Sequence, residues 1–142
     1  QTCALPILAI TFDGAPISVY FFSSSGGQTQ RAIDVWGTDI PYLTSVPDPW
    51  SLDKTLNPKY SKWVRTISQA TMAAAFNLPD VKKYVINSRT KTGSVLKITA
   101  YSSSGVKSTL PVGTFKTAVK LPSSWFAQPP TITMDETSTV TN

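Results

Sequence analysis

The stretch that decides the fold is YFFSSSGGQTQRAIDVWGTDIPYL, residues 20–43. An apolar, strand-like segment from Ile17 to Phe22 leads into it, and three serines and two adjacent glycines follow. Glycine permits a positive φ or the close approach of another group. The free hydroxyls and amides beside the glycines suit a polar, uncharged ligand such as a sugar. The alternative is an ordinary Ser/Gly loop after a strand, with Trp36 and Tyr42 as core aromatics.

Local patterns around this stretch predict an α+β fold with a mixed, mostly antiparallel β-sheet and two short helices. Upstream, the Asp13-Gly14 pair is a hairpin turn signal between strands over 8–12 and 16–22. One helical turn is expected within residues 29–35. Downstream, the alternation of apolar and polar residues over 62–67 predicts a half-buried strand.

Both helices are predicted in the second half of the chain. Ser68 is a suitable N-cap for an Ala-rich helix over 69–76, and Asn77 marks its end. The second helix, over 112–119, carries Phe115 and Val119 one turn apart, as a core-facing stripe requires.

The remaining strands are predicted over 81–88, 94–102 and 107–110, with a closing strand over 124–127. The first three alternate and are separated by short Gly-containing turns, which is typical of an antiparallel meander with one buried face. The residues expected on that apolar face are Val85, Leu96, Ile98, Ala100 and Val106.

The chain of 142 residues and 15.4 kDa is long enough for one domain with a core of its own. Residues 1–7, QTCALPI, look like a translated sequencing adapter, so we expect an artefact there and a domain over 8–126 that lacks its N-terminal part. The single cysteine, Cys3, lies in that segment, and no disulfide chemistry is argued from it. Residues 127–142 are Pro- and Thr-rich and are expected to form a linker or tail.

The net charge of +5 is unevenly distributed along the sequence. Residues 1–53 carry one arginine against five aspartates, a net charge of −4, whereas residues 54–120 carry ten lysines and two arginines against Asp80 alone, a net charge of +11. A basic half attracts polyanions. Because the lysines are scattered through alternating strand patterns, we expect solvated strand faces, with anionic wall polymers as the next candidate and no nucleic-acid partner. No apolar run approaches the roughly 20 residues that span a membrane.

The residue types limit the chemistry. The sequence has no histidine, so Ser-His and Cys-His nucleophile pairs and imidazole metal ligands are excluded, and we expect neither a metal nor a cofactor. Glycan cleavage needs a carboxylic acid of raised pKa beside the glycosidic oxygen. The single glutamate, Glu136, lies in the tail. Asp34, within Asp-Val-Trp-Gly, is the one aspartate in a plausible groove, and capping or loop bracing is its alternative role.

Several motifs in a fixed order carry a family resemblance. They are Ser24-Ser25-Gly26-Gly27-x-Thr29, then Asp34-Val35-Trp36-Gly37, then PYLTSVPDPW over 41–50, and finally GTFKTA over 113–118 with LPSSWF over 121–126. In this order they resemble the stage II sporulation protein D / LytB family, over roughly residues 8–126. The resemblance implies a lytic transglycosylase-type domain that cuts peptidoglycan glycan strands.

The resemblance also implies where a site would lie. The family's Ser-Gly-Gly loop borders the active cleft, which places a set of small polar residues along the glycan path: Ser23, Ser24, Ser25, Gly26, Gly27 and Thr29. Trp36 and Tyr42 are candidates to stack on sugar faces. The family's acid is a glutamate upstream of the first strand, and no residue here matches it. Positions that hold zinc ligands in some members correspond to Phe22 and Ser25, so no zinc is expected.

The first hypothesis is therefore that the chain forms part of the cleft of a secreted or envelope-attached transglycosylase and is inactive alone. Two further hypotheses remain open. One is a catalytically silent glycan-binding module, and the other is a structural module of a bacterial envelope complex. A sugar-binding assay separates these two, and upstream sequence carrying a helix with a glutamate would favour the enzyme.

Overall fold

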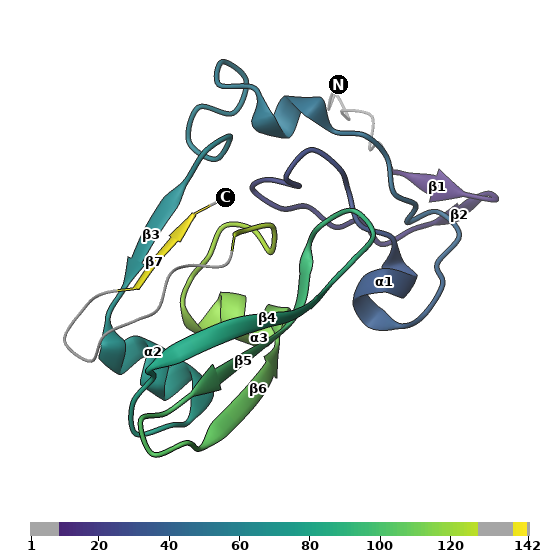
Figure 1. Ribbon diagram of the computed structural model, residues 1–142. Coiled ribbons are helices and arrows are strands. Elements are labelled where there is room, and N and C mark those ends of the chain that lie inside the picture. The colour runs from purple at the N-terminus through teal and green to yellow at the C-terminus, as the bar shows by residue number, and fades with distance from the viewer. Residues whose placement is uncertain (1–8, 128–137, 142) are drawn as a thin grey trace, which may run out of the picture.

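The computed structural model describes residues 9–127 and 138–141 (Figure 1). The expected adapter segment, 1–7, lies outside these residues, as does most of the expected tail. The fold class is confirmed: helices and antiparallel strands are mixed, in three small sheets ordered β1-β2, β3-β7 and β4-β5-β6. The elements are β1 Thr11–Phe12, β2 Ala15–Pro16, α1 Ala32–Trp36, the 3₁₀ helix η1 Pro49–Leu52, β3 Val64–Ile67, α2 Gln69–Phe76, β4 Lys83–Arg89, β5 Val95–Tyr101, β6 Lys107–Pro111, α3 Val112–Ala118 and β7 Ser138–Thr141.

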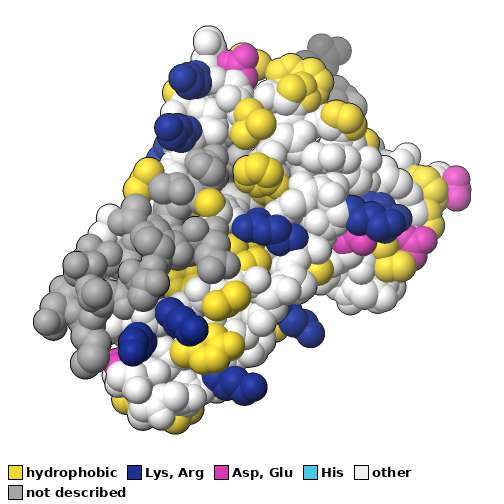
Figure 2. Space-filling model, in the orientation of Figure 1, with side chains coloured by type: hydrophobic (Ala, Val, Ile, Leu, Met, Phe, Trp, Pro, Cys, Tyr) yellow, Lys and Arg dark blue, Asp and Glu magenta, His cyan; other side chains and the backbone are white. Residues whose placement is uncertain are grey.

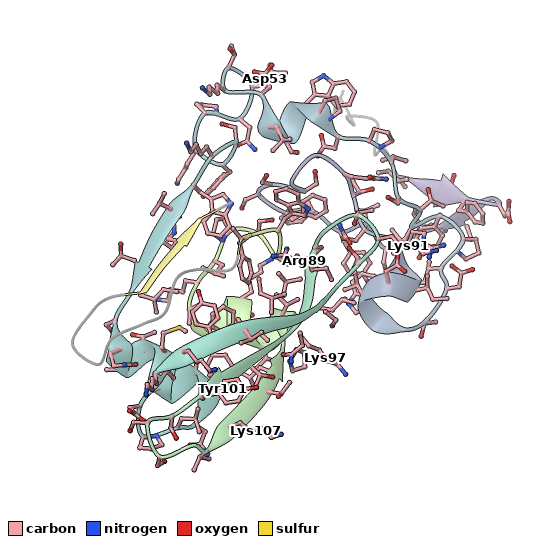
Figure 3. The ribbon with its side chains drawn as sticks, viewed as in Figure 1. Asp53, Arg89, Lys91, Lys97, Tyr101 and Lys107 are labelled. Atoms are coloured by element: carbon pink, nitrogen blue, oxygen red, sulfur yellow. The ribbon has the colours of Figure 1, made fainter. Side chains whose placement is uncertain are left out.

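The lysines on the meander β4-β5-β6 face solvent, as the scattered sequence pattern predicts. Lys97 on β5 and Lys107 on β6 are exposed and point away from the sheet (Figure 3). On the visible face of the molecule the Lys and Arg side chains form separate spots and no continuous basic patch (Figure 2).

The meander buries one face, and its register decides which residues lie there. Ile98 is paired with Ile86 on one side and Leu110 on the other, and Ala100 belongs to the same face. Ile98 and Ala100 are buried as predicted. The prediction for Val85 is wrong, because Val85 is paired with Thr99 on the opposite, polar face, where the Thr99 hydroxyl donates to Asn87 Oδ1 at 2.7 Å.

Two other positions of that predicted face differ as well. Leu96 is half-buried, and Val106 lies in the turn before β6 with 53% of its surface exposed. The residues that fill the core in their place are Tyr84 on β4 and Val95 at the start of β5. The pairing of β4 with β5 shifts register between Ile86 and Ser88 and again between Ser88 and Arg89, which strict alternation does not anticipate.

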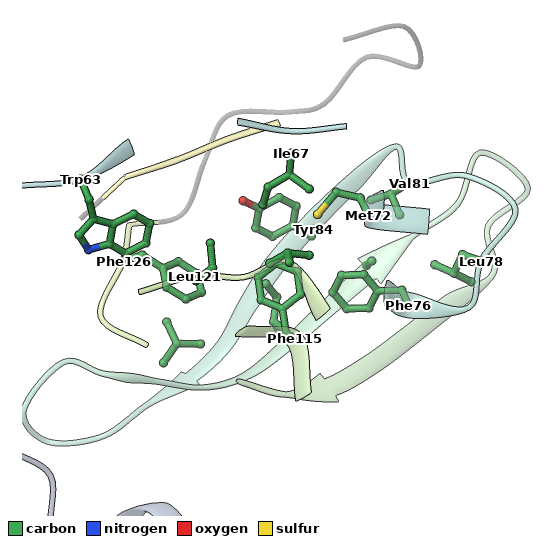
Figure 4. Close-up of a cluster of buried hydrophobic side chains, with 14 residues drawn as sticks. Trp63, Ile67, Met72, Phe76, Leu78, Val81, Tyr84, Phe115, Leu121 and Phe126 are labelled. Atoms are coloured by element: carbon green, nitrogen blue, oxygen red, sulfur yellow. The ribbon is translucent and has the colours of Figure 1, made fainter. Parts of the chain in front are cut away.

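The helices α2 and α3 cover the apolar face of the meander (Figure 4). Phe115 on α3 is fully buried, with ring centroids 5.4 Å from Phe76, 6.2 Å from Phe126 and 6.3 Å from Tyr84. The bounds of α2 are those predicted, because Ser68 Oγ accepts the Thr71 amide at 3.2 Å and so caps the helix.

Three strand predictions need correction. Asp13 and Gly14 adopt positive φ in a hairpin turn, as predicted, but the two paired strands are only two residues each. Residues 17–22 extend this hairpin by one backbone bond, from Ile17 N to Ile10 O, and form no strand. Residues 124–127 form no strand and share one backbone bond with the meander, from Val95 N to Ser124 O at 2.9 Å. Part of the expected tail instead forms β7, which pairs antiparallel with β3 from about seventy residues earlier.

Tyr84 presents an unusual combination of burial and polarity. Its hydroxyl is buried and has no hydrogen-bond partner within residues 9–127 and 138–141, and burial raises its pKa. We expect Tyr84→Phe to leave stability unchanged or to raise it by up to about 1 kcal/mol, since an unsatisfied buried hydroxyl is removed. The Tyr84 hydroxyl ionises more readily in the unfolded chain than in the folded one, so the free energy of unfolding of the wild type should fall above about pH 10. The variant lacks this hydroxyl and should lose less. Urea unfolding at pH 7 and pH 10.5 measures both; a loss above 1 kcal/mol at pH 7 would contradict the expectation.

Candidate functional site

The stretch 20–43 folds as a loop followed by α1, beside the β4-β5 hairpin (Figure 1). A second loop runs alongside it and holds it by backbone bonds, from Thr29 N to Val46 O at 3.0 Å and from Asp48 N to Gly27 O at 2.9 Å. The Thr92 hydroxyl at the tip of the hairpin donates to Gln30 Oε1 at 2.9 Å. The loop is therefore fixed on two sides.

The central serines brace this loop. Ser24 and Ser25 are buried, at 4% and 7% exposure. The Ser25 hydroxyl donates to Asp48 Oδ2 at 2.8 Å and lies 2.9 Å from Ser51 Oγ, which also accepts the Gly27 amide at 2.9 Å. The hydroxyls are thus satisfied inside the protein, and their first task is to hold the shape of the loop.

Trp125 lies between the same loop and the tip of the β4-β5 hairpin. Its indole Nε1 donates to the carbonyl of Thr92 at 3.0 Å. Gly26, at φ +76°, lies against the ring, and a Cβ there would be 2.7 Å from Trp125 Cβ. Gly93, at φ +97°, lies against it too, and a Cβ there would be 2.8 Å from Nε1. Both positions combine a backbone conformation that favours glycine with a space too small for a side chain.

An open cleft of about 480 Å³ lies over the stretch 20–43, within the size range of small-ligand sites. Its aromatic wall contains Tyr20 and Trp36, whose ring centroids are 4.9 Å apart at 49°. Trp36 is 52% exposed, so its alternative role as a core aromatic is wrong. Tyr42 also lines the cleft and is half-buried against Phe12, at 5.5 Å between centroids. The cleft therefore combines flat rings with hydroxyl and amide groups.

The structure brings together most, but not all, of the predicted site. Five of the residues expected along a glycan path line the cleft: Ser24, Ser25, Thr29, Trp36 and Tyr42. Ser23 lines a smaller adjoining cavity of about 370 Å³. Gly26 and Gly27 line neither cavity and act through the backbone.

Sequence reasoning missed the far wall of the cleft. This wall is formed by Lys116 from α3 and by Ser123 and Ser124. They lie more than seventy residues after the stretch 20–43, and no local sequence pattern links them to it. Phe21 and Phe22 were assigned to a strand, yet Phe21 is 96% exposed and both line the two cavities. Their signal was present in the sequence, since the side chains of a strand alternate between its two faces and three successive aromatics would place large rings on both.

Asp34 lies outside this lining and is held by Arg31. The guanidinium donates to both carboxylate oxygens, from Nε to Oδ2 and from Nη2 to Oδ1, each at 3.0 Å. This hydrogen bonding to Arg31, helped by the charge of Lys91 beside α1, lowers the pKa of Asp34 (Figure 3). A general acid needs the opposite shift. The geometry favours the bracing role for Asp34.

The cleft lining offers no other general acid, because none of its residues is Asp or Glu. The carboxylate of Asp53 accepts the amides of Leu56 and Thr55, and these bonds lower its pKa as well. In the described part of the chain, no three Cys, Asp or Glu side chains come together as a metal site would require. The cleft as it stands can bind and orient a ligand.

Comparison with known proteins gives two similar relatives, both called stage II sporulation protein D. The one from Bacillus subtilis (strain 168) is 44% identical over 61 residues, which are 43% of this chain and 17% of the relative. The one from Bacillus amyloliquefaciens is 47% identical over 51 residues, 36% of this chain and 14% of the relative.

The chain resembles stage II sporulation protein D. The expected resemblance is thus confirmed, over a segment that spans less than a fifth of the length of these relatives. No family model matches the chain. No helix in the described residues is long and apolar enough to cross a membrane.

Proposed function

We propose that this chain forms one wall of the glycan cleft in a peptidoglycan-remodelling domain of the lytic transglycosylase type, at the cell envelope or outside the cell. The observation that carries the proposal is the cleft itself. It gathers Trp36, Tyr42 and Thr29 in one open site, in a chain that is similar to stage II sporulation protein D over 61 residues. Aromatic rings beside uncharged hydroxyls and amides suit a sugar, whose faces are apolar and whose edges carry hydroxyls.

The acid that such a reaction requires would come from outside the described cleft. Protonation of the leaving oxygen needs a carboxylic acid of raised pKa. The cleft lining holds no carboxyl group, and Asp34 is paired with Arg31. We therefore propose that this chain positions the glycan and that a glutamate elsewhere in the intact protein acts as the acid.

Sugar binding by the cleft is tested with a pair of tryptophan variants. We expect Trp36→Ala to weaken binding of N-acetylglucosamine oligomers by about tenfold, because a ring that stacks on a sugar face is lost. Trp50→Ala is the matched control: Trp50 is 61% exposed and lies outside both cavities. Calorimetric titration measures the affinities, and thermal unfolding checks that both variants fold.

The rival functions predict different results in the same titration. Equal weakening by Trp36→Ala and Trp50→Ala would count against this cleft as the sugar site. No binding of any oligosaccharide by the wild-type chain would favour a structural envelope module.

A further inference from the structure

The cleft contains two cations, and their surroundings differ. Arg31 forms a two-bond pair with Asp34, so its charge is compensated. Lys116, in the last turn of α3, has no hydrogen bond or ion pair to its ammonium group within the described ranges, 9–127 and 138–141. It is half-buried, although a free lysine at a surface normally extends into water. One uncompensated positive charge therefore stands in the cleft.

The position of Lys116 within the site is distinctive. It lines the main cleft of about 480 Å³ and also the adjoining cavity of about 370 Å³. Phe21 and Phe22 are the other two residues common to both linings. Lys116 thus belongs to the surface that the two cavities share, together with Phe21 and Phe22. A ligand that fills the main cleft would carry a substituent past Lys116 into the second cavity.

We propose that Lys116 binds a carboxylate carried as a side substituent by the glycan, so that the cleft selects an acidic glycan over a neutral one. This inference rests on the proposed function and names the ligand class of the same site. The lining of neither cavity contains Asp or Glu, so nothing there competes for the ammonium group or repels a carboxylate. A lysine ammonium offers three donors to such a group.

The alternative role for Lys116 is structural. A cation in the last turn of a helix interacts favourably with the helix carbonyls. Lys120 provides the comparison: it follows Val119, the C-cap of α3, is exposed and lies outside both cavities. Lys116→Gln and Lys120→Gln remove the same charge from the same end of the helix, but only the first removes it from the cleft.

The test uses the disaccharide of N-acetylglucosamine and N-acetylmuramic acid in four forms. The lactyl carboxylate is free in the first and methylated in the second; the third carries a short peptide with a free terminal carboxylate, and the fourth has that terminus amidated. We expect the wild-type chain to prefer a free-carboxylate form over its neutral partner by about fivefold, and the preference to shrink at 0.5 M salt. The pair that shows the preference tells whether the carboxylate belongs to the sugar or to the peptide.

Lys116→Gln should reduce that preference to about one, while Lys120→Gln should retain it. Equal affinity of the wild-type chain for charged and neutral forms, or an unchanged preference in Lys116→Gln, would overturn the inference and leave sugar binding intact. If the wild-type chain binds none of the four forms and none of the neutral oligomers, the proposed function itself is overturned, and the inference with it.

Discussion

Gly26→Ala is expected to destabilise the domain by about 2–5 kcal/mol, one of the largest effects of any single substitution in this chain. Two costs combine. An alanine at φ +76° costs about 1–2 kcal/mol in the left-handed region. The added Cβ would also be 2.7 Å from Trp125 Cβ, and forcing the indole aside costs typically about 1–3 kcal/mol. Chemical denaturation with the midpoint and slope both fitted measures the loss.

Gly37→Ala separates the two costs. Gly37 has almost the same φ, +77°, and no atom within 4 Å of its would-be Cβ, so this variant should lose only the conformational part. In a Trp125→Ala background, Gly26→Ala should cost less than it does in the wild type, because the ring atoms are gone, but still more than Gly37→Ala, because the Cβ at position 125 remains. Equal losses for the two glycine variants in the wild-type chain would mean that Trp125 does not hold the loop.

The local elements could be predicted because their signals are local. The helix α2 follows from the Ser68 cap, an Ala-rich interior and Asn77, which ends it at φ +52°. The meander β4-β5-β6 follows from alternation and Gly-containing turns, and strict alternation fails where the pairing of β4 with β5 shifts register between Ile86 and Arg89. Where a side chain or a turn acts on its own neighbours, residue types and their spacing were sufficient.

Elements that depend on distant partners were missed. Nothing in the sequence near Ser138–Thr141 shows that this segment pairs with β3. The apolar run 17–22 has the composition of a strand, but the described residues offer no neighbouring strand to pair with Tyr20 or Phe21, and these side chains line the cleft instead. Strand formation requires a partner, which composition alone does not supply.

The candidate site was half predictable for the same reason. The near wall, with Thr29, Trp36 and Tyr42, is contiguous in sequence, and the motif order indicated it. The far wall depends on how α3 packs beneath the loop, so Lys116 could be recognised only in three dimensions. The Ser-Gly-Gly loop itself is predicted to contact the ligand, whereas the Ser25 hydroxyl is hydrogen-bonded to Asp48 and Ser51 inside the protein.

The other large expected effect is on cleavage. Alone, the 142-residue chain should release no muropeptides from purified peptidoglycan, because the described cleft has no carboxyl group to protonate the leaving oxygen. On the proposed function, joining an N-terminal portion of stage II sporulation protein D, with the glutamate that the family resemblance implies, ahead of Leu8 should produce cleavage. Changing the donated upstream glutamate to glutamine should then lower turnover by about 10²–10⁴-fold, the usual contribution of general acid catalysis, with folding unchanged.

Asp34 provides the control in that chimera. Because Arg31 lowers its pKa and the carboxylate lies outside the cleft lining, Asp34→Asn should leave turnover within about twofold, unlike the change to the donated glutamate. Chromatography of the soluble products, with mass spectrometry to identify anhydro ends, measures turnover and reaction type together. Cleavage by the chain alone that Asp34→Asn abolishes would contradict this account, since the acid would then be Asp34, and the pairing with Arg31 would have to open when glycan binds.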